Sequence, residues 1–302
     1  MSLPRRILSG RQYMVTRRCT ERMFLLKADE KSRALFWYLM AEAAQRHGVL
    51  VHAAVFMSNH LHIVLTDVRG NLPEFCHLLF GQIAKAVNAA TGHVEAVFAK
   101  ADRPNLLELV TPEAVVREIA YLLANPAKAG LVDTAEEWPG LITRPEDLAK
   151  GAEYIGRPGD NPYLARRDVQ GLVMRIEPVP GINGAQFAHL VAAELERHER
   201  DARRERRSRG LGVLGAEAVR RQHWRKLPKT GARLFGLKPT IAAARQLARI
   251  VALVAVKRFR RDYAEALASF RQGKRNVEFP LGTWRMCALF GAAVAAPLPA
   301  GS

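Results

Sequence analysis

Residues 57–65, with the sequence Met-Ser-Asn-His-Leu-His-Ile-Val-Leu, constrain the fold most strongly, because they predict a β-strand entered through a polar turn. Successive side chains of a strand point to opposite faces, so His60 and His62 share one face while Leu61 helps to anchor the strand. Two imidazoles one strand step apart can hold the same metal ion. A half-exposed strand edge without a ligand is the alternative that this stretch alone leaves open.

A predicted helix carries the second motif. Apolar residues recur at helical spacing from Ile119 to Leu123, and Pro126 disfavours helical geometry at Asn125, so the helix is expected to end or bend there. Tyr121 and Asn125 are four residues apart and are therefore neighbours on one helix face. A phenol that can act as a nucleophile and an amide oxygen would then face the same space. A tyrosine packed in the core is the alternative for Tyr121.

Together, the Asn-His-Leu-His strand and the later Tyr-x-x-x-Asn-Pro-x-x-Ala-Gly-Leu-Val segment resemble the motifs of single-tyrosine transposases. These enzymes belong to the His-hydrophobic-His (HUH) nuclease superfamily, and the resemblance is to the branch called REP-associated tyrosine transposases. It covers roughly the first half of the chain. The two motifs occur in the family's order and at about its separation.

The resemblance implies a mechanism. His60 and His62 would bind a divalent cation, Mg2+ or Mn2+, with Asn125 as the third protein ligand. Tyr121 would attack a phosphate of single-stranded or hairpin DNA and become linked to the 5′ phosphate, so that a free 3′ hydroxyl can reverse the reaction. Some related transposases have a glutamine where this chain has Asn125, and Lys128 replaces a frequent arginine.

The predicted elements between Tyr13 and Val110 occur in the order strand, helix, strand, strand, helix, strand. This order matches an α+β, ferredoxin-like (RRM-like) antiparallel sheet with flanking helices, which is the fold that the resemblance implies. We expect a catalytic domain over residues 1–145, in which His52 lies at the surface or at a pocket rim. A linker follows over residues 146–183, with one short helix from Pro162 to about Met174.

The chain carries 46 Lys and Arg residues against 29 Asp and Glu residues, a net charge of +17. Such a charge favours phosphate backbones or anionic membranes as partners. The sequence contains no apolar run of membrane-spanning length and no signal-peptide core, and its three cysteines are widely spaced. We therefore expect a cytoplasmic, nucleoid-associated protein with no membrane partner, no disulfide framework and no zinc ribbon.

Residues 184–302 are predicted to be mainly helical, basic and DNA-binding. One charged helix is expected over 184–209 and two shorter ones over 215–221 and 239–248. The motif over 277–284 is expected to dock onto these helices. The arginines and lysine predicted to contact DNA are Arg17, Arg18, Lys85, Arg203, Arg204, Arg206, Arg207, Arg220 and Arg221. For Arg17, Arg18 and Lys85 a solvated surface charge is the alternative.

Two other functions stay open. A regulator on the same fold would bind hairpin DNA without cleaving it, although it would have no need to keep both histidines, Tyr121 and Asn125. A hydrolytic, metal-dependent nuclease would cleave DNA without using Tyr121. The sequence is also compatible with a homodimer or a monomer, and it does not specify the hairpin.

Overall fold

The computed structural model describes residues 3–99, 103–165, 167–228 and 239–296. Its first strands and helices form four strands of the main sheet and the two helices that connect them. They are β1 (Arg11–Arg18), α1 (Glu30–His47), β2 (Val49–Met57), β3 (His60–Asp67), α2 (Leu72–Thr91) and β4 (Asn105–Leu109). This is the order of strands and helices that the sequence predicts.

Five strands form the main sheet, in the order β2-β3-β1-β4-β7. The first three neighbouring pairs are antiparallel, whereas β7 (Ile241–Ala242) pairs parallel to β4. The helix predicted over 239–248 is wrong in its first half. Backbone bonds of 3.0 and 2.9 Å join Glu108 N to Thr240 O and Val110 N to Ala242 O, and Ile241 is buried. Pairing with the open edge of β4 outweighs local helix propensity.

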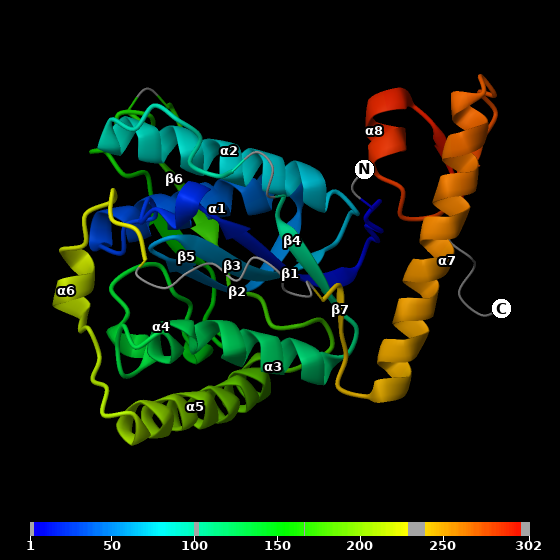
Figure 1. Ribbon diagram of the computed structural model, residues 1–302. Coiled ribbons are helices and arrows are strands. Elements are labelled where there is room, and N and C mark those ends of the chain that lie inside the picture. The colour runs from blue at the N-terminus through cyan, green and yellow to red at the C-terminus, as the bar shows by residue number, and fades with distance from the viewer. Residues whose placement is uncertain (1–2, 100–102, 166, 229–238, 297–302) are drawn as a thin grey trace.

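Helices cover both faces of the sheet (Figure 1). On one face lie α1 and α2, and the rings of Phe36 in α1 and Phe56 in β2 are 5.0 Å apart. The other face is covered by α3 (Pro112–Leu123), which α4 (Asn125–Lys128) follows, and α5 (Gly184–Ser208) packs against these two helices. Val115 and Ile119 of α3 are fully buried and belong to the main hydrophobic core. The sheet is thus a mixed sheet held between two helical layers.

Local signals set the helix ends. The Asp29 carboxylate accepts a hydrogen bond from Ser32 N at 2.9 Å, and α1 stops at Gly48, which has a left-handed φ of 65°. At the start of α3, Thr111 Oγ1 accepts from Ala114 N at 3.3 Å and Pro112 occupies the first turn. These caps confirm the predicted starts of both helices.

The predicted linker contains a β-hairpin in place of the expected short helix. Strands β5 (Glu153–Gly156) and β6 (Gly171–Met174) pair antiparallel beside α1, so the helix predicted from Pro162 to Met174 is wrong. Contacts distant in sequence decide this, because Tyr38 donates its hydroxyl to Val169 O at 3.1 Å. The main core continues past this hairpin into Phe187 and Val191 of α5. The predicted domain boundaries stay a prediction.

The remaining elements are short, apart from one long helix. They are η1 (Thr20–Arg22), η2 (Ala135–Glu137), η3 (Pro145–Leu148), α6 (Ala216–Arg220), α7 (Gln246–Arg271), β8 (Glu278–Phe279), α8 (Arg285–Phe290) and β9 (Ala293–Val294). Phe279 and Met286 form a small second core against α7. Trp284 donates its indole N–H to Glu74 of α2 at 2.5 Å, so the 277–284 motif docks on both α7 and the main body. Within the described ranges, every helix is too short or too polar to cross a membrane.

Candidate active site

His60 and His62 face the helical layer that contains α3. In the register of the sheet, His62 lies opposite Val55 on β2, and neighbouring Phe56 points to α1. Because paired residues of antiparallel strands share a face and successive residues alternate, both histidines point away from α1. They therefore point to the side of the sheet on which α3, α4 and α5 lie (Figure 1).

The two imidazoles are adjacent and each is held through Nδ1. Their ring centroids are 5.0 Å apart. His60 Nδ1 lies 2.7 Å from the side-chain oxygen of Asn59, and His62 Nδ1 lies 2.9 Å from Thr16 Oγ1. With Nδ1–H donating to these oxygens, Nε2 carries the free lone pair on each ring. Neither Nε2 has a hydrogen-bond partner among the residues that the structure describes.

Burial and nearby arginines keep both rings neutral. Burial, with the positive charges of Arg18 and Arg22, lowers the pKa of His60 to about 4. Burial, together with His60 and Arg18, lowers the pKa of His62 well below its ordinary value. Both groups are thus unprotonated at neutral pH, which is the state that a metal ligand requires.

The donor set fits a divalent cation through two nitrogen ligands. Neutral imidazole and oxygen donors suit Mn2+, whereas Mg2+ prefers oxygen. In the described part of the chain, no group of three His, Cys, Asp or Glu side chains is placed to hold a metal ion. Any further ligands would have to be amide, water or phosphate oxygens.

Asn125 is the amide that the sequence singles out. It begins α4, directly after the helix that carries Tyr121, and it is half-buried. Its Nδ2 is buried and has no hydrogen-bond partner within the described residues. An unpaired buried amide is costly, so this side chain is open to a polar ligand. Within the part of the chain that the structure describes, no hydrogen bond joins Asn125 to either histidine.

The Tyr121 residue is 42% exposed, and its ring lies beside the side chains of Lys128 and His198. The ammonium Nζ of Lys128 is 3.7 Å from the centroid of the phenol ring, and the His198 ring meets it edge-on at 6.1 Å. The exposure rules out the core alternative for Tyr121. The structure brings this ring together with Lys128 and His198, whereas it records no contact between Tyr121 and His60 or His62 in the described ranges.

The surroundings of Tyr121 are electrostatically perturbed. Burial lowers the pKa of Lys128, and burial and then Lys128 lower the pKa of His198. Burial raises the pKa of Glu118, which lies one helical turn before Tyr121. Such shifts favour uncharged forms and are common where charge develops during a reaction. The sequence analysis missed His198, since it lies on α5 and only packing brings it here.

Three basic residues of the first domain are predicted to contact DNA, and their surroundings differ. They are Arg17, Arg18 and Lys85. Arg17 donates to Ala99 O at 2.9 Å, and its guanidinium lies 5.5 Å from the Phe98 ring centroid, so it is engaged within the fold. Arg18 is exposed and pairs with His60 across β1 and β3. Lys85 is exposed on α2. Of the three, Arg18 is therefore placed closest to the histidine pair.

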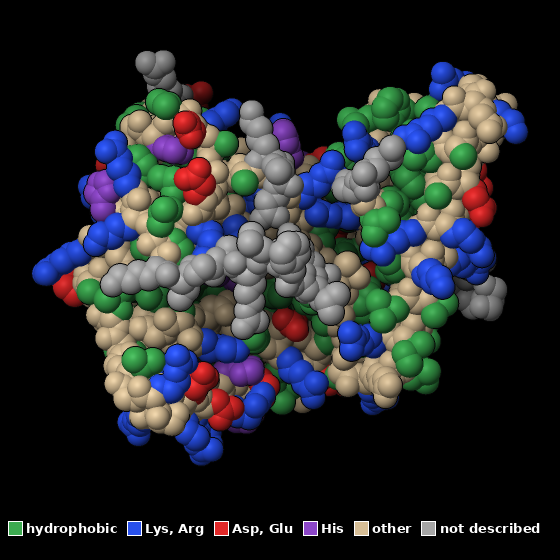
Figure 2. Space-filling model, viewed as in Figure 1, with side chains coloured by type: hydrophobic (Ala, Val, Ile, Leu, Met, Phe, Trp, Pro, Cys, Tyr) green, Lys and Arg blue, Asp and Glu red, His purple; other side chains and the backbone are tan. Residues whose placement is uncertain are grey.

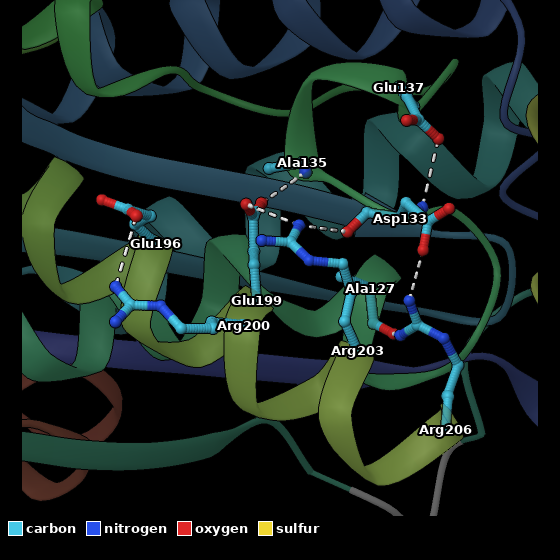
Figure 3. A network of polar contacts seen from close by, with 9 residues as sticks. All are labelled: Ala127, Asp133, Ala135, Glu137, Glu196, Glu199, Arg200, Arg203 and Arg206. Carbon is cyan, nitrogen blue, oxygen red and sulfur yellow. Dashed lines mark hydrogen bonds and ion pairs between the residues drawn. The ribbon is translucent and has the colours of Figure 1, made fainter. Parts of the chain in front are cut away.

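Several arginines of α5 make hydrogen bonds and ion pairs within the protein (Figure 3). Arg206 donates to Ala127 O at 2.6 Å and pairs with Asp133 at 2.5 Å, and its side chain is only 11% exposed. Arg203 lies 4.0 Å from Glu199, whose other carboxylate oxygen accepts from Ala135 N at 2.7 Å. These contacts fasten α5 to the segment that follows α4.

The other predicted DNA contacts are exposed on the surface. Arg204 and Arg207 are exposed on α5, whereas Arg220 and Arg221 pair with Glu217 at 3.4 and 3.0 Å. Figure 2 shows further Lys and Arg side chains along the hollow between α7 and the main body. Exposed basic side chains therefore lie both on the main body and beside α7.

No protein-family model matches this chain, and no curated protein sequence does. The solved structures that are similar to part of it include the following two. A REP-associated tyrosine transposase bound to a REP hairpin covers 50% of this chain and 87% of its own, with 19% identity and a TM-score of 0.42. A protein described as a candidate transposase from Deinococcus radiodurans R1 covers 35% of this chain and 85% of its own, with 17% identity and a TM-score of 0.28.

Proposed function

We propose that this chain is a single-tyrosine HUH transposase, which cleaves and rejoins single-stranded hairpin DNA through a 5′-phosphotyrosine intermediate. One observation carries the proposal: the neutral histidine pair presents two free Nε2 atoms on the side of the sheet where α3 exposes Tyr121. The strand order β4-β1-β3-β2 with helices after β1 and β3 supports a ferredoxin-like (RRM-like) palm.

The reaction uses the Tyr121 hydroxyl as the nucleophile. Its oxygen forms a bond to the scissile phosphorus, the bond from phosphorus to the 3′ oxygen breaks, and the phenolic proton is lost as the 3′ oxygen gains one. The products are a 5′-phosphotyrosine and a free 3′ hydroxyl, so the ester conserves the bond energy for rejoining. Exposure of Tyr121 gives the DNA strand access to the phenol.

His60 and His62 would hold Mg2+ or Mn2+, with Asn125 as the third protein ligand. When bound, the cation would stabilise the negative charge that develops on the phosphate. Thr16 and Asn59 orient the two rings through Nδ1. Arg18 adds positive charge beside the pair, and this charge favours a phosphate there.

The partner would be single-stranded or hairpin DNA in the bacterial cytoplasm. The exposed arginines of α5 and the basic surface beside α7 would bind its backbone. A hairpin-binding regulator and a hydrolytic nuclease are the competing functions. They differ from the transposase in whether Tyr121 becomes covalently attached to DNA.

The test is incubation of the protein with labelled hairpin DNA from the flanks of its gene, with Mn2+, followed by denaturing electrophoresis. A metal-dependent protein–DNA adduct that Tyr121→Phe abolishes would support the transposase. Tyr154→Phe is the matched control, because Tyr154 is also exposed and lies on the β5–β6 hairpin beside α1. Cleavage without an adduct in wild type and Tyr121→Phe would favour the hydrolytic nuclease. Binding without cleavage would favour the regulator.

A further inference from the structure

Trp224 follows α6 and carries a cluster of aromatic and cationic side chains. The His223 ring stacks on the indole at 5.6 Å with an interplanar angle of 24°, and the Arg225 guanidinium lies 4.9 Å from the ring centroid. His93, from the segment after α2, meets the indole at 5.4 Å and 66°. The cluster therefore joins residues from two distant parts of the chain.

Only part of the Trp224 indole is buried in the hydrophobic core. Trp224 is half-buried and packs against the edge of the main core, whereas His223 and Arg225 are exposed. The two exposed side chains next to it come from its own sequence neighbours, and Arg225 N donates a hydrogen bond to His223 Nδ1 at 3.2 Å. The Nε2 of His93 is buried and lacks a hydrogen-bond partner among the described residues. A polar ligand could satisfy this nitrogen, which the protein leaves unpaired.

Backbone hydrogen bonds connect the cluster to the histidine strand. Trp224 O accepts from Phe24 N at 3.1 Å, which attaches the indole to the segment between β1 and α1. That segment is bonded in turn to the turn before β3, since Cys19 N donates to Asn59 O and Leu26 N to Ser58 O, each at 2.9 Å. Trp224 is therefore held at the end of the sheet where His60 begins its strand.

We propose that Trp224, flanked by His223 and Arg225, is a stacking platform for one unpaired nucleobase of single-stranded DNA. The inference rests on the proposed function and extends it, because it assigns a site for a base beside the strand that holds the scissile phosphate. An indole stacks with any base through its π-face, and an adjacent arginine adds a cationic contact. The base would take the place of the His223 ring on the indole.

The test uses a single-stranded oligothymidylate of about twelve nucleotides, a length within the site sizes of single-strand binding proteins. Intrinsic fluorescence follows binding to the full chain. Stacking predicts strong quenching in the wild type and loss of most of it in Trp224→Phe, which keeps Trp37, Trp138 and Trp284 and retains affinity. Trp224→Leu should weaken binding about tenfold. It should leave the slope of log affinity against log salt unchanged, because no counterion contact is lost.

Two controls bracket this result. Tyr154→Leu removes an exposed aromatic ring from β5 and should leave oligothymidylate affinity at the wild-type value. Arg225→Gln should lower the salt slope by about one. Equal quenching in the wild type and Trp224→Phe would overturn the platform. This comparison decides even if Trp224→Leu fails to fold, since phenylalanine preserves the packing of the ring.

The platform and the transposase can fail separately. Binding of oligothymidylate requires neither metal nor Tyr121, so Tyr121→Phe should quench like the wild type. A wild-type adduct with hairpin DNA, together with unchanged quenching in Trp224→Phe, would remove the platform and leave the transposase. Quenching that depends on Trp224 without any adduct would support the platform and overturn the transposase.

Discussion

The ammonium group of Lys128 lies 3.7 Å from the centre of the Tyr121 ring. Lys128 is the last residue of α4, the short helix that follows the tyrosine helix, and the break between α3 and α4 brings its side chain back over the phenol. A cation in this position holds the ring in one orientation and favours negative charge on the phenol and on an incoming phosphate. Lys128 is thus a positioning residue for the proposed nucleophile.

Lys128→Ala should slow adduct formation about fivefold, since a cation–π contact is worth ~1 kcal/mol at a partly exposed site. Lys128→Arg should restore most of the rate, because arginine also places a cation over a ring. Single-turnover rates with labelled hairpin DNA measure the effect. Lys31→Ala removes an exposed lysine from the start of α1, on the other face of the sheet, and serves as the control. An unchanged rate in Lys128→Ala would remove its positioning role.

Thr16→Val removes the hydroxyl that orients His62 while preserving the shape of the side chain. Loss of a hydrogen-bond partner that orients a metal-binding histidine lowers metal affinity by about tenfold to a hundredfold. The Mn2+ concentration for half-maximal adduct formation should therefore rise by about tenfold. His60→Ala or His62→Ala should abolish metal-dependent adduct formation. Thr91→Val is the matched control at the end of α2. Equal Mn2+ requirements in Thr16→Val and Thr91→Val would contradict the arrangement.

His52 should make stability depend on pH. The sequence predicts His52 at the surface or at a pocket rim, and this prediction is wrong. His52 is fully buried, and its two ring nitrogens lie 2.7 Å from Glu177 O and from Thr66 Oγ1. Burial lowers its pKa to about 4 from 6.5. The unfolded chain therefore binds a proton more readily than the folded chain.

The resulting stability is fully present above about pH 6.5 and is lost as the pH falls toward about 4. Over this window the contribution is ~3 kcal/mol, from about 1.4 kcal/mol per pKa unit. His52→Gln should be less stable at neutral pH and should lose less stability on acidification. Urea unfolding at several pH values tests this, with His47→Gln as the half-exposed control. The same acid sensitivity in both variants would show that other groups are responsible.

Arg206 and Arg204 are both in the basic run of α5, and their substitutions should separate stability from DNA binding. Arg206→Ala leaves Ala127 O and the Asp133 carboxylate without their guanidinium partner. It should lower the free energy of unfolding by ~2 kcal/mol. Arg204→Ala should leave stability unchanged within about 0.5 kcal/mol.

Arg204→Ala should instead lower the slope of log DNA affinity against log salt by about one. Thermal unfolding and salt titrations measure the two effects. A destabilised Arg204→Ala variant with an unchanged salt slope would reverse these assignments.

Strand alternation, helical periodicity and helix-capping residues predicted the local features of the fold and of the candidate site. The alternation of a strand places His60 and His62 on one face, and apolar residues at helical spacing before Pro126 place Tyr121 on a helix that ends before Asn125. Thr111 and Asp29 likewise cap the helices that follow them. Each of these depends on atoms within a few residues, so the local sequence is sufficient.

Contacts between distant segments could not be predicted in the same way. Residues 239–248 begin as β7 because the edge of β4 is available, and residues 171–174 form β6 because β5 and α1 lie beside them. Neither partner can be identified from the segment itself, since the hydrogen bonds that fix its conformation are made elsewhere in the chain. The burial of His52 beneath Glu177 has the same origin.

The sequence by itself determined the histidine pair, the tyrosine helix and its break at Asn125, because strand and helix periods follow from the covalent chain. Only the tertiary structure decided what surrounds them. It brings His198 to Tyr121, attaches Trp224 to the segment beside His60, and turns Arg206 from a proposed DNA contact into a clamp on Ala127 and Asp133. Packing of α5 onto α3 and α4, and of Trp224 after α6 onto the segment between β1 and α1, creates these contacts, and no local period encodes them.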